Sequence, residues 1–237
     1  MRFIIHADDF GKSESVTRAI DEVVMRRLCD ETSLMVNMPY ANEAVDLARK
    51  NGYANRVGMH INLTEGMPLT ESIRRCPRFC NSDGSFSKSF HMSTAARFSL
   101  TAGERRAVRD ELDAQLRRFI SYGGLMMRID SHHHVHTDWS IYRLLVPLAM
   151  KYGFKTMRIS ADMHHVRFDK EIYKQLFNRS VRRHFETTDH FDGAANASRG
   201  GFGGTIEVMV HPMFAGGVLC DTIVPYEKAI VKIRQES

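Results

Sequence analysis

Short apolar runs alternate with longer amphipathic segments along this chain, and the alternation constrains its fold more than any other feature. The apolar runs predict strands at residues 2–6, 33–38, 56–62, 126–129, 155–159, 187–191 and 206–210. Apolar residues at helical spacing predict helices after an N-cap at Ser13 and at residues 42–49, 104–122, 140–152, 170–182 and 226–236. Such alternation is typical of parallel strands with right-handed crossovers. Six or seven strands suit either a barrel or an open sheet.

We expect one domain over residues 1–237, because the chain is long enough for a single sizeable core and shows no internal repeat or linker. One stretch, residues 64–102, lacks a clear pattern and carries Pro68, Pro77 and Asp83-Gly84. Irregular segments of this length in a compact domain are usually lids or binding loops. We therefore expect a long loop insertion there, with an influence on which substrate fits.

Composition excludes several classes of protein. The net charge of +5 is spread over scattered arginine pairs, which are more typical of solvated helix faces than of a nucleic-acid footprint. The first residues lack the apolar core of a signal peptide, and no apolar run approaches the roughly 20 residues that span a bilayer. We expect a cytoplasmic protein that binds neither nucleic acid nor membrane and keeps its four dispersed cysteines reduced.

Histidines are concentrated where the fourth predicted strand ends. Four of the nine residues in the segment Arg-Ile-Asp-Ser-His-His-His-Val-His, residues 128–136, are histidine. Imidazole is the commonest metal ligand in proteins and the usual acid or base near neutral pH. An expression tag is excluded because the run is internal. The alternative is a solvated loop without a chemical role.

Polar residues also stand at the ends of other predicted strands: Asp8-Asp9, His60, Asp130 with His132, and His211. In a parallel α/β fold these ends lie on one face, so the side chains would meet in one cleft. Adjacent aspartates repel each other, and a divalent cation would compensate. One aspartate and two histidines would make a three-ligand site, leaving the second aspartate free as a base. Taken singly, the aspartate pair could instead be a turn or cap, His60 a core residue, and His211 a strand end.

Four stretches carry a resemblance to a known family: residues 6–11 (HADDFG), 57–68 (VGMHINLTEGMP), 129–136 (IDSHHHVH) and 207–212 (EVMVHP). Together, in this order and at this spacing, they resemble the YdjC-like carbohydrate deacetylases over essentially the whole chain. The resemblance implies an α/β fold, a distorted (β/α) barrel with about seven parallel strands, similar to the NodB-type polysaccharide deacetylases. It also suggests a homodimer.

The implied activity is removal of the acetyl group from an N-acetylated amino sugar, as in chito-oligosaccharides. The resemblance implies roles for six residues, three as ligands of one divalent metal ion and three in catalysis: Asp9, His60 and His132 as ligands, Asp8 as general base, His211 as general acid and Arg158 steadying the catalytic aspartate. Ligand type favours zinc and the family favours magnesium. We further expect Asp130 to orient a metal ligand. For His133, His134 and His136 we expect ordinary loop or structural roles, with contact of one of them to the sugar as the alternative.

Two other functions remain open on the sequence. A phosphoesterase-like metal hydrolase on the same barrel would require a second metal ion roughly 3.5–4 Å from the first, and few spare carboxylates stand at strand ends. A non-catalytic carbohydrate-binding protein would need no base and acid, so the presence of Asp8 and His211 argues against it.

Overall fold

Seven parallel strands form the central sheet of the structure, a computed structural model that describes residues 1–164, 167–197, 202–221 and 224–226. The strands are β1 (Arg2–Phe10), β2 (Glu31–Leu34), β3 (Val57–Ile61), β4 (Arg128–Ser131), β5 (Thr156–Met157), β6 (His190–Gly193) and β7 (Thr205–Val210). Their order across the sheet is β5-β4-β3-β2-β1-β7-β6, and each neighbouring pair is parallel. The carboxyl ends of all seven strands therefore lie at one edge.

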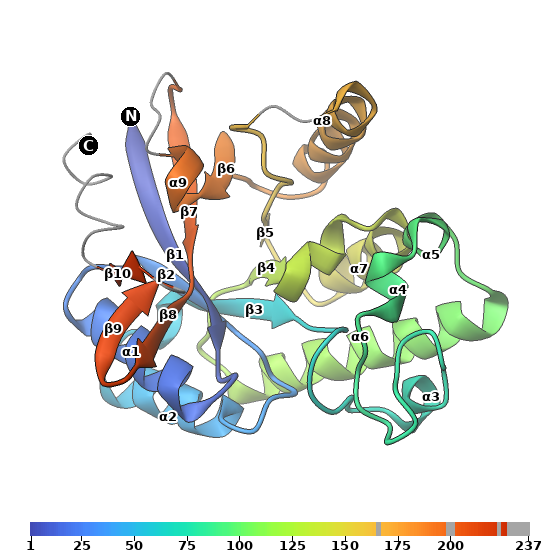
Figure 1. Cartoon of the computed structure of the whole chain (residues 1–237), viewed down its shortest axis with the longest axis horizontal. Helices are drawn as coiled ribbons and strands as arrows, with labels where there is room; N and C mark the ends of the chain where they lie inside the picture. Colours follow the sequence, from blue (N-terminus) through green and yellow to red (C-terminus); the bar gives the residue numbers. More distant parts are fainter. Residues whose placement is uncertain (165–166, 198–201, 222–223, 227–237) are drawn as a thin grey trace.

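The strand order is that of a barrel opened between β5 and β6. Each strand lies beside its neighbours in the sequence, with β7 next to β1, so the sheet curls on itself (Figure 1). Three backbone hydrogen bonds cross the opening: from Glu186 N to Lys155 O at 2.9 Å, and from Met157 N to Glu186 O and Asp162 N to Phe191 O, both at 3.1 Å. The predicted distorted (β/α) barrel of about seven parallel strands is confirmed.

The long helices flank this sheet: α1 (Glu14–Met25), α2 (Ala41–Lys50), α6 (Ala102–Tyr122), α7 (Trp139–Lys151) and α8 (Phe168–Arg182). Ser13 caps α1 as predicted, because its side chain accepts a hydrogen bond from Val16 N. A capping box between Thr101 and Glu104 begins α6, two residues before the predicted start. No helix in the described part of the chain is both long enough and apolar enough to span a membrane.

Strand β1 extends four residues beyond the predicted end at His6. Its pairing with β2 is in register at Ala7 opposite Thr32 and again at Phe10 opposite Leu34, so β1 holds one extra residue in between. This irregularity is a β-bulge, and Asp8 and Asp9 occupy it. Asp9 has a φ of 75°, in the left-handed region that non-glycine residues seldom adopt. Both aspartates are therefore held by the sheet rather than by a loop.

The segment 64–102 has more structure than we expected. It contains three short helices, α3 (Glu71–Arg74), α4 (Ser89–Met92) and α5 (Thr94–Phe98). Phe79, Phe86 and Phe90 from this segment are buried, and the rings of Phe79 and Phe90 stack at 4.6 Å. The sequence did not predict this packing, because the three phenylalanines are isolated residues that follow neither helical nor strand periodicity. The segment is a packed layer over the edge of the barrel rather than a loose loop.

A second, antiparallel sheet follows the last barrel strand. It consists of β8 (Pro212–Ala215), β9 (Val218–Asp221) and β10 (Val224–Pro225), and the sequence pattern did not predict it. Its first strand lies against α1 (Figure 1), where the Ser15 hydroxyl donates to Phe214 O at 2.9 Å. The predicted helix at 226–236 lies outside the described residues, except for Tyr226.

Burial of Phe90 yields a test of this packing. We expect Phe90→Ala to lower the free energy of unfolding by about 3–5 kcal/mol, because the truncation leaves a cavity beneath the stacked Phe79 ring. The matched control is Phe98→Ala, since Phe98 lies in the same segment but is 53% exposed. Urea denaturation of both variants measures the difference. Equal effects of the two substitutions would show that the segment does not pack as described.

Candidate active site

The bulge in β1 turns two adjacent aspartates toward different partners. The Asp8 carboxylate meets the guanidinium of Arg158, whereas the Asp9 carboxylate meets the imidazoles of His60 and His132. In a regular strand, neighbouring side chains would point to opposite faces of the sheet. The extra residue and the left-handed backbone at Asp9 bring both carboxylates to the carboxyl-terminal edge.

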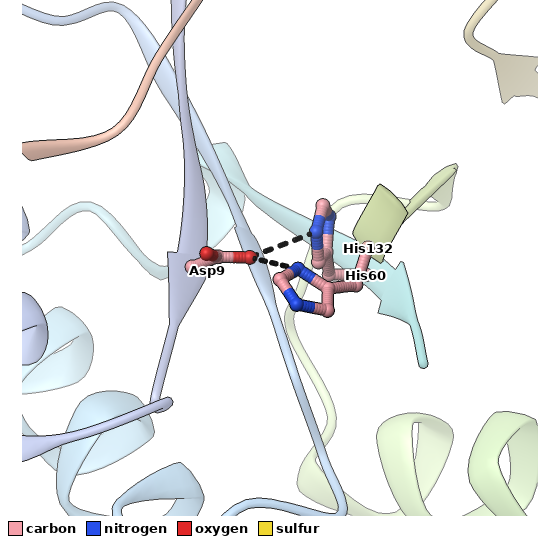
Figure 2. A group of neighbouring side chains, drawn as sticks. All are labelled: Asp9, His60 and His132. Atoms are coloured by element: carbon pink, nitrogen blue, oxygen red, sulfur yellow. Dashed lines mark hydrogen bonds and ion pairs between the residues drawn. The ribbon is translucent and has the colours of Figure 1, made fainter. Parts of the chain in front are cut away.

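Asp9, His60 and His132 converge on one point (Figure 2). They come from β1, from β3 and from the 3₁₀ turn (His132–Thr137) that follows β4. Asp9 Oδ1 lies 2.7 Å from His132 Nδ1 and 3.2 Å from His60 Nε2, and the candidate ligand atoms all lie within 4.8 Å of one another. All three side chains are buried, so the structure brings together the three residues that were predicted as metal ligands.

His60 is held in the orientation that a metal ligand requires. It lies directly opposite Asp130 in the parallel pairing of β3 and β4, and its Nδ1 is 2.7 Å from Asp130 Oδ1. The other ring nitrogen, Nε2, is buried, makes no hydrogen bond to a described residue and faces Asp9. Metal-ligating histidines typically bind a carboxylate through the second nitrogen in this way. The contact expected for Asp130 is present.

The charges around His60 favour a cation. Burial alone would lower the pKa of His60, but the Asp130 and Asp9 carboxylates outweigh burial and raise the pKa to about 10. Burial would conversely raise the pKa of Asp9, and its contacts with the two histidines hold it well below the usual range. A carboxylate and two imidazoles in a pocket that attracts positive charge fit a divalent ion such as zinc.

Two further residues at this point were missed by the sequence reasoning. Glu65 Oε2 lies 2.9 Å from His132 Nε2, and Lys12 Nζ lies 2.9 Å from the same oxygen and 3.4 Å from Asp9 Oδ2. The His132 contact is the largest influence on the pKa of Glu65, which it lowers, with help from Lys12, to about 2. Glu65 lies after β3 in the stretch 57–68 that carries the family resemblance, and this position could have indicated a role at the site. Lys12 carries no such signal.

Arg158 fixes the Asp8 carboxylate with two hydrogen bonds. Its two terminal nitrogens donate to the two oxygens of Asp8, each at 2.7 Å, and its Nε donates to Glu207 Oε1 at 2.6 Å. Burial alone would raise the pKa of Asp8, but the guanidinium outweighs burial and lowers it to about 2. Asp8 is therefore ionised across the pH range in which proteins function. The predicted contact between Arg158 and this aspartate is present.

A buried charge network extends beneath the site. Asp130 Oδ2 lies 3.0 Å from both Arg158 and His6 Nε2, and Arg128 pairs with Glu207 at 2.5 Å. His6, Asp8 and Asp130 come close enough together to suggest a second metal group. The guanidinium of Arg158 already contacts both carboxylates, so a fixed cation supplies the positive charge at that place.

His211 follows β7 and lines the same cleft as Asp8, Asp9, His60 and His132. The cleft has a volume of about 710 Å³. The backbone N–H of His211 donates to Asp221 Oδ1 at 2.8 Å. Asp221 belongs to β9, so the small antiparallel sheet fixes the backbone that carries the His211 imidazole. Arg158 is buried behind the cleft wall and does not line it. Five of the six predicted site residues therefore share one cavity, and the sixth holds Asp8 from behind.

The remaining histidines of the run separate into two groups. His136 is buried, with Nδ1 2.5 Å from Ser131 Oγ and Nε2 3.2 Å from Arg158 O, so its contacts are structural as expected. His133 and His134 both line the cleft, contrary to a purely structural role in the loop. Their φ angles of 50° and 55° place both in the left-handed region.

Comparison with known proteins shows the family of this chain. The family model described as YdjC-like protein matches residues 2–228. The chain belongs to the YdjC-like family. A carbohydrate deacetylase of Geobacillus stearothermophilus is 32% identical over 213 residues, covering 89% of this chain and 79% of the relative. A carbohydrate deacetylase of Halalkalibacterium halodurans is 30% identical over 229 residues, covering 92% and 88%.

A solved structure supports the fold independently. A putative cellobiose-phosphate cleavage protein from Enterococcus faecalis superposes with a TM-score of 0.73 over 99% of this chain and 92% of its own. Its sequence is 22% identical, so the likeness concerns the fold alone. The family match over residues 2–228 confirms the resemblance to the YdjC-like family that the four sequence stretches predicted.

The raised pKa of His60 predicts how cation binding depends on pH. Because this pKa is about 10, His60 carries a proton at neutral pH, and a metal ion must displace that proton. We expect the apparent affinity for Zn²⁺ to rise about tenfold per pH unit near neutrality, with about one proton released per ion. Calorimetric titrations in buffers of different ionisation enthalpy measure both quantities. An affinity that stays constant with pH would contradict the assignment of His60.

Proposed function

We propose that this chain is a metal-dependent carbohydrate deacetylase that hydrolyses the acetamido group of an N-acetylated amino sugar, such as a chito-oligosaccharide. The observation that supports the proposal best is one cleft lined by the group Asp9, His60 and His132 and by an ionised Asp8. The relatives' names give the same class of activity, carbohydrate deacetylase. The hydrolase thus acts on the amide C–N bond of a sugar.

Hydrolysis of an amide needs an activated carbonyl, an activated water and a protonated leaving group. A divalent ion held by Asp9, His60 and His132 would polarise the acetyl carbonyl and lower the pKa of a water molecule. Asp/His/His ligation suits zinc, and magnesium is the alternative given by the family resemblance. Side chains of the protein would carry out the two proton transfers, from the attacking water and to the leaving amine.

Asp8 is our candidate for the general base. Arg158 holds both of its oxygens, so the carboxylate has a fixed orientation and remains ionised, ready to accept a proton from the attacking water. Its low pKa makes it a weak base, and activation of the water by the ion would offset this. Positioned bases of this kind typically contribute about 10²–10⁴ to the rate.

His211 is our candidate for the general acid. It lines the cleft just after the end of β7, whereas the three proposed ligands come from β1, β3 and the turn after β4. A proton from its imidazole would reach the departing sugar nitrogen, which otherwise leaves as a strongly basic anion. The hydrogen bond from His211 N to Asp221 fixes the backbone at this position.

The alternatives are less compatible with the same residues. A two-metal phosphoesterase would need a second ion, and Arg158 occupies the position between Asp8 and Asp130 where the second group of ligands lies. A protein that only bound carbohydrate would not require a buried guanidinium to hold an ionised aspartate at the cleft. We retain one domain, a cytoplasmic location and a homodimer as expectations.

Acetate release tests the activity directly. We expect acetate from N,N'-diacetylchitobiose, loss of release after chelation, and recovery when zinc or magnesium is returned, because the ion activates both the carbonyl and the water. The ion that restores the higher rate identifies the metal. If protein that binds one ion per chain releases no acetate from this or other N-acetylated amino sugars, the proposal is wrong.

Substitution of Asp8 separates catalysis from metal binding. We expect Asp8→Asn to reduce kcat by about 10²–10⁴ while one ion per chain remains bound, because Asp8 is the base and Asp9 the ligand. Asp46→Asn, at an exposed position in α2, is the matched control and should leave both quantities unchanged. Steady-state kinetics and elemental analysis give the readouts. Near-native turnover in Asp8→Asn would mean that another group takes the proton.

A further inference from the structure

The imidazole ring of His134 has no hydrogen-bond partner among the described residues. Its Nδ1 is buried without a partner, and its Nε2 makes no hydrogen bond to the described part of the chain either. His136, two positions later, has both ring nitrogens satisfied by Ser131 and Arg158. A polar group without a partner destabilises the site, so a ligand in the cleft that hydrogen-bonds the Nε2 atom of His134 gains binding energy. His134 is therefore poised to bind something that enters the cleft.

The backbone around His134 is held in an unfavourable conformation. Two consecutive non-glycine residues, His133 and His134, have φ angles of 50° and 55°. The turn is fixed from several sides, because Thr137 Oγ1 donates to His134 O at 2.8 Å and Thr64 Oγ1 lies 2.9 Å from His133 Nδ1. Strained conformations that surrounding contacts enforce are concentrated at functional sites. Here the strain points two imidazoles at the cleft.

His134 stands where two cavities meet. It lines the cleft of about 710 Å³ and also an adjoining pocket of about 340 Å³, whose wall includes Thr137, Lys174, Phe191 and Asp192. The ring of Phe191 meets the ring of His134 edge-on at 5.8 Å and fixes its position. Phe191 itself is buried, so the polar groups that this pocket offers are the hydroxyl of Ser160, the imidazole of His164 and the ammonium group of Lys174, which suit the hydroxyl rim of a sugar. The adjoining pocket thus has the chemistry of a second sugar site.

We propose that His134 is a substrate-binding residue that hydrogen-bonds the sugar where the acetylated unit joins the next unit, and that the adjoining pocket receives this next unit. The proposal rests on the proposed function and specifies its substrate as at least a disaccharide. His134 is not part of the Asp9, His60 and His132 group, so its role is separate from metal binding. It recognises the substrate rather than moving a proton.

Two substitutions of His134 separate hydrogen bonding from backbone strain. Asn tolerates the left-handed conformation but is too short to place a polar atom where Nε2 lies, whereas Gln reaches that distance. We expect His134→Asn to lower kcat/KM for N,N'-diacetylchitobiose by about tenfold, mainly through KM, since one hydrogen bond is lost. We expect His134→Gln to recover part of the loss. Release of acetate from N-acetylglucosamine should change less than threefold in both variants.

Lys174 provides an independent probe of the adjoining pocket. Its Nζ contacts only His164 Nε2, at 3.3 Å, among hydrogen bonds in the described chain, so its removal should leave the fold intact. We expect Lys174→Ala to reduce the preference for the disaccharide over the monosaccharide. His184→Ala, at an exposed position just after α8, is the matched control and should leave the preference unchanged. Metal content and Tm are measured for every variant.

The outcomes separate this proposal from the proposed function. Equal losses on both substrates in His134→Asn, a fall in kcat alone, or loss of metal would overturn the substrate-binding role. If the native protein released no acetate, calorimetric binding of the disaccharide would decide: binding weakened by His134→Asn would keep the sugar site and overturn only the deacetylase activity. Neither binding nor release would overturn both.

Discussion

The buried guanidinium of Arg158 holds together carboxylates that would otherwise repel one another inside the sheet. It contacts Asp8, Asp130 and Glu207 at 2.6–3.0 Å, and these come from three different strands. Breaking a buried pair by removing one partner typically costs about 3–5 kcal/mol, because the remaining charge is left uncompensated. The position of Asp8 in the cleft, and through Asp130 the orientation of His60, both depend on this one cation.

The bulge in β1 complements that cation. Asp8 and Asp9 are consecutive, yet Asp8 binds a guanidinium and Asp9 faces two imidazoles. Two equivalent carboxylates side by side would share a proton or repel, whereas here each has its own positive partner. One inserted residue in a strand therefore produces two carboxylates with different surroundings, which is what a base and a ligand require.

The convergence of Asp8, Asp9, His60 and His132 could be predicted from the sequence, because parallel strands place their carboxyl ends at one edge whatever the details of the loops. The contacts of Glu65 and Lys12 with this group could not be predicted, because they depend on how the chain turns after β3 and after β1. The anchoring of the segment 64–102 escaped prediction because isolated aromatic residues have no period. The role of His134 could not be predicted either, because the histidines of this run differ only in the hydrogen-bond partners of their ring nitrogens.

The opening between β5 and β6 has a consequence for the range of molecules that such a scaffold can serve. In a closed barrel, the number and tilt of the strands fix the width of the mouth. Here the contact between Asp162 and Phe191 across the opening substitutes for a missing strand pair, and Phe191 also lines the pocket beside the cleft. Changes at this seam would widen or narrow the mouth while the chemistry on β1, β3 and β4 stays intact, so ligand size and reactivity can diverge independently.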